Sequence, residues 1–300
     1  MAYQGKQENA LLAELPHALV LILLLLVLLV VLTKFGWVQC SQVPGNWCQI
    51  YCEQVMRTHS RVILLSGDSG MGDPAALEMM VRHVRPYTYL EPYQSKYLTY
   101  GMLDGADLVI LEKMDTVSFT QALAIKKYLQ GGGAALWIGD SATKFYTDDY
   151  EIARARVMDE EAVYAAQAAG QTLADPHYYE NALNNASTQR GFYLLSDVLM
   201  ADFVSSNSST VPIGLSVVDY KSLLVSGLFA DFPTSAKNYT VVVPNTANTH
   251  IVAMIKANGK EYPGIYETRY AGKVVYVAFP LEEANSTTLV QNVLDYLVTC

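Results

Sequence analysis

The run Ala106–Thr143 constrains the fold more than any other part of the chain. It opens with an apolar run, Leu108–Leu111, whose length and composition predict a strand buried on both faces. Ser118 then stands three residues before Gln121, the capping-box spacing of a helix start. A second apolar run, Ala134–Ile138, follows the helix. Strand, helix and strand in so short a stretch predict a right-handed βαβ unit, and therefore a parallel, helix-covered sheet.

The sequence on either side of this unit predicts more of the same sheet. Arg61–Ser66 is predicted as the first strand and Tyr87–Leu90 as a weaker second one. Asp73 followed by Pro74 has the pattern of an N-cap with a proline in the first helical turn. We expect Gly131 to end the central helix in the left-handed conformation.

The C-terminal part predicts antiparallel strands. His250–Ala257 and Glu261–Tyr270 are joined by Asn258-Gly259, a typical two-residue hairpin turn. A further strand, Lys273–Ala278, and a last helix over Thr287–Val298 follow. We therefore predict a flavodoxin-like, doubly wound α/β fold with a mostly parallel sheet, which the antiparallel C-terminal strands extend.

An insertion is predicted over about residues 147–240. Asp149–Leu173 is rich in alanine and charge, which predicts an exposed helix. Asn181–Asn207 is polar, and we expect it to be mostly loop, with a helix over Phe192–Phe203.

These features resemble the class I glutamine amidotransferase-like superfamily, in particular its non-amidotransferase branch, which includes ThuA-like domains. The matching residues are Leu103–Leu111, Gly131–Gly139 and Tyr266–Phe279. The likeness spans about Arg61–Leu297, with gaps. Because unrelated functions share such scaffolds, the resemblance implies a fold much more than an activity.

The N-terminal part has the composition of a membrane segment. Ala18–Leu32 is uninterruptedly apolar, and its extension to Val38 reaches the roughly 20 residues needed to span a bilayer. The alternative is a cleaved signal peptide, but Glu8 and Glu14 stand where that class of peptide has positive charge. The predicted boundaries are a tail over 1–15, a transmembrane helix over 16–38, a cysteine-containing stalk over 39–60 and the α/β domain over 61–300.

The charge of the chain limits its partners. The formal net charge is −9 and there is no basic run, which argues against nucleic acid and anionic lipid. We expect contact with membrane lipid through residues 16–38 and with other membrane or envelope proteins. A homo-oligomer stays open, and no cofactor is expected.

Four cysteines, Cys40, Cys48, Cys52 and Cys300, allow three pairings. Cys48 and Cys52 are one helical turn apart, a poor geometry for pairing with each other. The last helix should end at the sheet edge where the chain enters, so we predict the bridges Cys40–Cys48 and Cys52–Cys300. Free thiols and a zinc site are the alternatives, although the spacing lacks the usual C-x2-C pair.

The side of the membrane is predicted from the cysteines. One lysine lies on each side of the apolar run, Lys6 before it and Lys34 after it, so the positive-inside rule hardly favours either orientation. Disulfides indicate an oxidising compartment, so we predict a single-pass cell-membrane protein whose C-terminal domain is extracytoplasmic. Glycosylation would be possible there at the sequons of Asn185, Asn207, Asn238 and Asn285.

Sheets of this kind bind ligands beyond the carboxyl ends of their strands. An acidic cluster there would suit a hard cation such as Ca²⁺. The spacing matches no known cation-binding loop, however, so no metal site is predicted. The candidate ligand-edge residues are Ser66, Asp68, Asp73, Glu112, Asp115, Asp140 and Glu282.

Related amidotransferases place a nucleophilic cysteine on the turn after the strand equivalent to Ala134–Ile138, with a histidine and a glutamate later in the chain. Here that turn carries Asp140 and Ser141, and Pro280-Leu281-Glu282 replaces the expected His-x-Glu. The resemblance therefore implies that the glutaminase triad is absent. Ser141 would need a histidine within hydrogen-bond reach, and no motif places one. We predict no catalytic residue and keep Asp140 and Ser141 as subsidiary candidates.

Together these patterns predict a membrane-anchored, catalytically inactive amidotransferase-like domain that is a binding or assembly component of a cell-surface or envelope complex. Two alternatives stay open. One is a hydrolase or sugar-active enzyme of the ThuA-like type. The other is a pilin-like filament subunit packed through its N-terminal hydrophobic helix, for which Met1–Lys6 would be a short leader.

Overall fold

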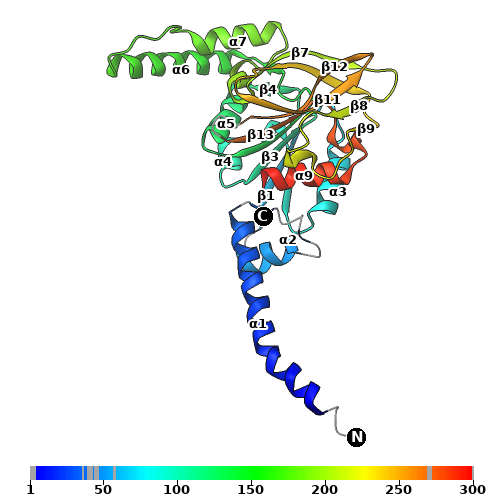
Figure 1. Ribbon diagram of the computed structural model, residues 1–300. Helices are drawn as coiled ribbons and strands as arrows, with labels where there is room; N and C mark the ends of the chain where they lie inside the picture. The colour runs from blue at the N-terminus through cyan, green and yellow to red at the C-terminus, as the bar shows by residue number, and fades with distance from the viewer. Residues whose placement is uncertain are drawn as a thin grey trace. The chain divides into compact units, whose positions relative to one another are not determined.

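The computed structural model in Figure 1 describes residues 5–35, 37–38, 43, 47–56, 59–268 and 272–298, with side chains from residue 16 onward. The chain forms two compact units, an N-terminal unit that ends at Thr58 and a second unit, His59–Val298, which we call the head.

The N-terminal unit contains one long helix, α1 (Gly5–Lys34), with Pro16 inside it. The stretch Pro16–Lys34 is long and apolar enough to cross a membrane, a test that signal sequences also pass. Most of its leucine and valine side chains are exposed, and Leu29, Val30 and Leu32 are half-buried. The helix ends at Lys34, short of the predicted Val38. Beyond it, Trp47 begins α2 (Trp47–Gln49) and donates a hydrogen bond from Nε1 to Thr33 Oγ1 at 3.2 Å.

The head is built on a nine-stranded sheet of order β2-β1-β3-β5-β13-β12-β11-β8-β9. The first five strands in this order are parallel, and the remaining pairs are antiparallel. The α/β class, the large mostly parallel sheet and the antiparallel additions predicted from the sequence are therefore confirmed. The strands are β1 (Arg61–Ser66), β2 (Tyr89–Gln94), β3 (Leu108–Glu112), β5 (Ala134–Ile138), β8 (Gly214–Val217), β9 (Asp231–Pro233), β11 (Thr249–Ala257), β12 (Lys260–Thr268) and β13 (Lys273–Val277).

Helices cover both faces of this sheet. The crossovers from β1 to β2 and from β3 to β5 run in opposite directions across the sheet, so right-handed connections place α3 and α5 on opposite faces. Helix α9 packs against α3, and α4 packs against α5. The helices are α3 (Pro74–Val84), α4 (Tyr100–Leu103), α5 (Phe119–Gln130), α6 (Asp149–Ala168), α7 (Tyr178–Thr188), α8 (Ser196–Leu199) and α9 (Thr287–Leu297).

Local sequence signals fix several of these boundaries. The Asp73 side chain accepts a hydrogen bond from Ala75 N at 3.1 Å, and Ser118 and Gln121 form both bonds of the capping box. Gly131 has a φ of −74°, and the left-handed residue is Gly132 with a φ of 94°. Our prediction was wrong by one residue, because the left-handed position is the one after the cap.

The predicted insertion contains more regular structure than expected. Helix α6 begins at Asp149 as predicted but ends at Ala168, before the predicted Leu173, and α7 occupies sequence predicted as loop. The helix predicted over Phe192–Phe203 is wrong: short helical turns end at Met200, and β7 (Ala201–Ser208) begins there. This strand pairs with β10 (Asn238–Pro244), a distant partner that local patterning cannot reveal.

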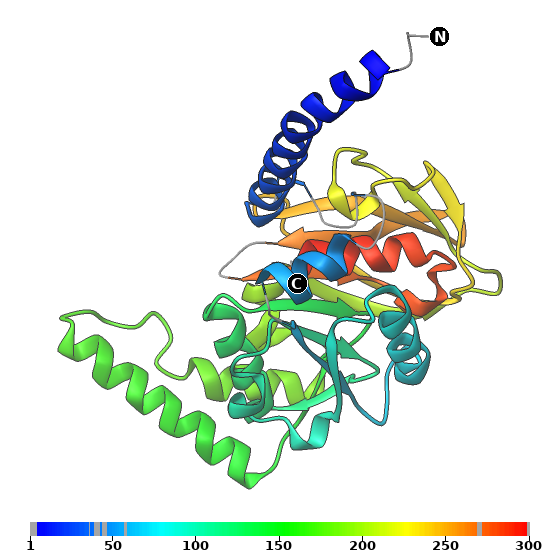
Figure 2. The same ribbon diagram turned by 90° about the horizontal axis from the view of Figure 1, so that it is seen from below.

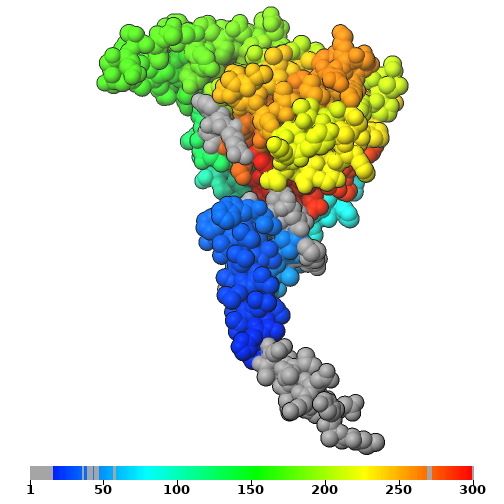
Figure 3. Space-filling view, viewed as in Figure 1, coloured from blue at the N-terminus to red at the C-terminus, as the bar shows by residue number. Residues whose placement is uncertain are grey.

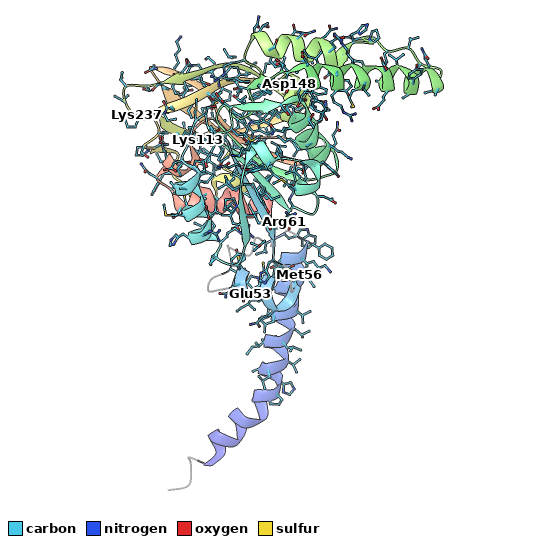
Figure 4. All side chains as sticks on the ribbon, turned by 180° about the vertical axis from the view of Figure 1, so that it is seen from behind. Glu53, Met56, Arg61, Lys113, Asp148 and Lys237 are labelled. Atoms are coloured by element: carbon cyan, nitrogen blue, oxygen red, sulfur yellow. The ribbon has the colours of Figure 1, made fainter. Side chains whose placement is uncertain are left out.

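Helices α6 and α7 and their connection form a projection that we call the arm, residues 149–188. Two views at right angles show it extending away from the sheet (Figures 1 and 2). Asp148 caps α6 by accepting a hydrogen bond from Glu151 N at 2.9 Å, and it lies at the base of the arm (Figure 4). A smaller pair of strands, β4 (Thr116–Ser118) and β6 (Lys144–Tyr146), lies nearby in sequence.

Candidate functional site

The predicted ligand-edge residues all lie at the carboxyl ends of the parallel strands, but they do not form one site. They divide among an open pocket, a charged cluster and a buried pair of carboxyl groups. Two of the residues have side chains in none of the three: Ser66 ends β1, and Asp73 caps α3.

The pocket has a volume of about 440 Å³ and lies where β1, β2 and β3 end. Because β2 and β3 leave β1 in opposite directions, this is the topological switch point at which α/β sheets bind ligands. Of the predicted residues only Asp68 lines it. Sequence reasoning proposed none of the other polar side chains of its wall as site residues, and it identified Ser118 and Gln121 only as a capping box. These side chains belong to Ser69, Ser95, Lys96, Thr116, Ser118, Gln121 and Tyr146.

The charged cluster consists of Asp115, Asp140 and Arg190. Arg190 Nη2 lies 2.7 Å from Asp140 Oδ2 and 3.7 Å from Asp115 Oδ2. Both carboxylates are almost completely buried, whereas the Arg190 side chain is 33% exposed. Thr143 Oγ1 accepts a second hydrogen bond from Arg190 at 2.9 Å, and the guanidinium lies over the Phe203 ring. Arg190 is therefore held in place by an ion pair, a hydroxyl and an aromatic face.

Both oxygens of the Asp140 carboxylate are occupied. Met71 N donates to Oδ1 at 3.0 Å, while Ser206 Oγ donates to Oδ2 at 3.2 Å beside Arg190. Asp115 lies 2.5 Å from Lys144 Nζ. Burial alone would raise the pKa of Asp115, but hydrogen bonds from Lys144, Ser69 and Thr116 outweigh burial and lower that pKa. Asp115 is therefore a carboxylate at neutral pH.

The second residue of this turn, Ser141, is completely buried. Its Oγ lies 2.8 Å from the carbonyl oxygen of Ile138 and 3.1 Å from that of Leu111, both hydrogen-bond acceptors. The turn itself is fixed by Tyr276 Oη, which donates to Gly139 O at 2.8 Å. Ser141 is thus held by main-chain carbonyl groups and not by a base.

Among the described histidines, those with a hydrogen-bond or ion-pair partner contact residues other than Ser141. His59 Nδ1 lies 3.1 Å from Tyr87 O. His177 lies near Glu180 on the arm. His250 lies at the amino end of β11, 3.0 Å from both Asp219 and Glu267. The arrangement that would activate Ser141 is not formed by these residues.

The buried pair consists of Glu112 and Glu282. Glu112 is completely buried at the end of β3. Within the described residues, no N–H or hydroxyl group hydrogen-bonds either of its oxygens. Glu282 Oε1 accepts a hydrogen bond from Asp73 N at 2.7 Å, and the Glu282 carboxyl group hydrogen-bonds Glu112. Burial, followed by the charge and hydrogen bond of Glu282, raises the pKa of Glu112 to about 10.

Glu112 is therefore a neutral acid at pH 7. Gly72 makes this approach possible, because a Cβ at that position would lie 2.5 Å from Glu112 Oε1. The φ of Gly72 is 104°, which also favours glycine. Asp73, predicted at the ligand edge, caps α3 with its side chain and binds Glu282 through its backbone N–H.

In the part of the chain that the structure describes, no group of three or more His, Cys, Asp or Glu side chains is placed to hold a metal ion. Neither Cys48 nor Cys52 is a free thiol. Cys40 and Cys300 lie outside the described residues, so the pairing stays a prediction.

The four predicted glycosylation sites differ in access. Asn185, Asn238 and Asn285 are exposed. Asn207 is half-buried in β7, and its Nδ2 donates to Ser205 Oγ at 2.9 Å. Of the four sequons, that of Asn207 is therefore the least accessible.

No protein-family model matches the chain, and no curated protein matches it. Several solved structures share its fold. A ThuA-like protein from Bacteroides uniformis aligns with a TM-score of 0.51 and 12% identity, over 80% of this chain and 90% of that one. A cytoplasmic protein from Salmonella typhimurium aligns with a TM-score of 0.50 and 13% identity, over 79% and 98% of the two chains.

A cold-adapted β-galactosidase from Rahnella sp. R3 aligns with a TM-score of 0.53 and 14% identity. The alignment covers 80% of this chain but 31% of the galactosidase, so this chain corresponds to about a third of that enzyme. At these identities the likeness establishes a shared fold and no shared activity.

Proposed function

We propose that this protein is a single-pass membrane protein whose head is a flavodoxin-like, amidotransferase-like domain without catalytic activity. Its role would be to bind other proteins in a cell-surface or envelope complex. One observation carries the proposal. At the turn after β5, where amidotransferases have their nucleophile, Asp140 is neutralised by Arg190 and Ser141 is bonded to main-chain carbonyl groups.

A nucleophile must be free to reach its substrate and must have a base beside it. At this turn the Asp140 oxygens are taken by Arg190, Met71 and Ser206. Arg190 lies two residues after the arm, so the insertion itself returns to this turn. These contacts support a structural role for the position.

Glutamine should therefore not be hydrolysed by the full-length protein. Ammonia release from glutamine is expected to stay at the level of the buffer, and Ser141→Ala is expected to give the same trace. A coupled glutamate dehydrogenase assay measures the ammonia, and intact-mass spectrometry detects acyl-enzyme. An adduct that is lost in Ser141→Ala would show that the turn is catalytic.

The membrane part of the proposal rests on α1. A stretch of 19 residues, Pro16–Lys34, spans about 28 Å at 1.5 Å per residue, close to the thickness of the hydrocarbon core. The exposed rings of Phe35 and Trp37 follow it, as expected at a membrane–water interface.

Retention of this helix can be measured directly. We expect the protein to stay in the pellet after alkaline carbonate extraction, and we expect mass spectrometry to find peptides that include residues 7–34. Replacing Leu24 and Leu28 with lysine should release it into the supernatant, because two charges at the bilayer centre cost about 5–7 kcal/mol. A mature N-terminus beyond Lys34 would instead identify a cleaved signal peptide.

A second candidate is a hydrolase or sugar-active enzyme, and the pocket at the switch point favours it. Polar side chains from three strand ends and from the start of α5 converge there around an open volume. In that case the catalytic groups would belong to the pocket and not to the turn after β5.

A further inference from the structure

The base of the arm is fixed to the rest of the head by hydrogen bonds to carboxylates. Glu151 Oε2 accepts from both N and Oγ1 of Thr120 at 2.9 Å, which joins α6 to the start of α5. Asp159 accepts from the backbone N–H groups of Tyr179 and Glu180 at 2.8 and 3.0 Å. Asp159 thus supplies the acceptors that the first turn of α7 needs. The relative orientation of the two helices is set at this point.

The tip of the arm is not covered by anything within the described residues. From Glu160 to Tyr178 no residue is buried. The space-filling view shows this part standing clear of the rest of the head (Figure 3). Helices of this length owe most of their stability to packing, so an uncovered helical tip is typical of a surface that packs against something else.

A groove of about 670 Å³ runs between α6 and α7. Val163, Tyr164 and Pro176 give it an apolar wall, and Glu160 and Glu180 give it acidic groups. Tyr164 lines the groove and is 72% exposed, so its ring is accessible to a partner. The groove therefore offers an apolar surface with negative charge beside it.

The arm is also the most acidic part of the molecule. Residues 149–188 contain seven acidic side chains and two arginines, a formal net charge of −5 out of −9 for the whole chain. Arg156 is already paired with Glu180 at 2.8 Å. Two arms of the same charge would repel each other, and anionic lipid or nucleic acid would be repelled in the same way.

We propose that the groove of the arm binds a basic amphipathic helix from another protein. Such a helix would place its apolar face against Val163 and Tyr164 and a lysine or arginine side chain beside Glu160, the usual mode of helix-in-groove recognition. The exposed Glu161, which follows Glu160 on α6, adds negative charge next to the groove. This inference deepens the proposed function, on which it rests for the existence of a protein partner.

The test uses the full-length protein in nanodiscs of zwitterionic lipid. The probe is a labelled 18-residue amphipathic helix of leucine and lysine, and fluorescence anisotropy measures its binding. Two comparison peptides have glutamate in place of lysine, or the same residues in scrambled order. We expect the basic helix to bind with micromolar affinity, and the other two peptides at least tenfold more weakly.

Three variants locate the site. Glu160→Lys with Glu161→Lys is expected to weaken binding at least tenfold, and Tyr164→Ser about tenfold. The matched control, Asp104→Lys with Glu261→Lys, changes the net charge by the same amount at exposed positions outside the arm and should bind like wild type. Circular dichroism checks that the arm variants keep their helix content.

Equal weakening in the control would overturn the proposal, because the attraction would then come from net charge alone. If the basic peptide binds empty nanodiscs as tightly as nanodiscs that contain the protein, the peptide binds lipid, and the proposal is overturned. Concentration-dependent dimerisation, seen in sedimentation velocity and lost in Tyr164→Ser, would replace the basic partner with a second copy. Ammonia release from glutamine would refute the proposed function without affecting any of these results.

Discussion

Replacing Glu112 with glutamine is expected to stabilise the head by about 3 kcal/mol at pH 7. The folded protein keeps this carboxyl group protonated, with a pKa of about 10 against 4.5 for an unperturbed glutamate. At pH values between 4.5 and 10, the Glu112 carboxyl group is ionised in the unfolded chain and protonated in the folded protein. Stability from Glu112 is therefore complete below pH 4.5 and is lost as pH rises toward 10, by about 1.4 kcal/mol per pH unit.

Glutamine has the shape of the protonated acid and donates an N–H group to Glu282 at every pH. The advantage of Glu112→Gln should vanish near pH 4.5 and grow toward pH 9. Urea unfolding at pH 5, 7 and 9 measures it, with the exposed substitution Glu261→Gln as the control. If Glu112→Gln is less stable than wild type at pH 9, the protonated state of Glu112 is contradicted. Glu112 would then be ionised in the folded protein, and a group other than Glu282 would stabilise its negative charge.

Replacing Arg190 with methionine is expected to destabilise the head by roughly 2–4 kcal/mol at pH 7. Asp140 would lose its ion-pair partner, and Asp115 would lose one of two cations, while both carboxylates stay buried. The lower end of the range applies because Arg190 is one-third exposed and water can partly replace it. Thermal or urea unfolding of the full-length protein measures the loss.

The pair can be isolated with a double-mutant cycle. Asp140→Asn in the Arg190→Met background should recover part of the stability, because the uncompensated charge is then gone. The stability of Arg190→Lys should lie between those of wild type and Arg190→Met, because an ammonium group keeps the charge but loses the second hydrogen bond to Thr143. Additive effects of Arg190→Met and Asp140→Asn would contradict a direct interaction.

Sequence patterns predicted the elements whose causes are local. The limits of β1 and β5 follow from short apolar runs, and Asp73 and Ser118 cap their helices as their positions indicate. The hairpin at Asn258-Gly259 has positive φ at both residues, as this dipeptide predicts. In each case the deciding residues lie within a few positions of one another.

The candidate site depended on contacts between distant residues, and there the sequence was less informative. Arg190 belongs to no motif, and its partner Asp140 lies 50 residues earlier. Glu112 and Glu282 were both expected at the ligand edge, but nothing in the sequence showed that they would face each other. The strand β7 was missed for the same reason, since its partner β10 comes about thirty residues later.

The position of Arg190 has a consequence for the arm. Helix α7 ends at Thr188, so only Gln189 separates it from the guanidinium that neutralises Asp140. A protein that tilts α7 would also move this side chain and change the charge balance inside the head. If a partner tilts α7 in this way, occupancy at the tip and electrostatics at the turn after β5 would be linked energetically, and such linkage would act equally in both directions.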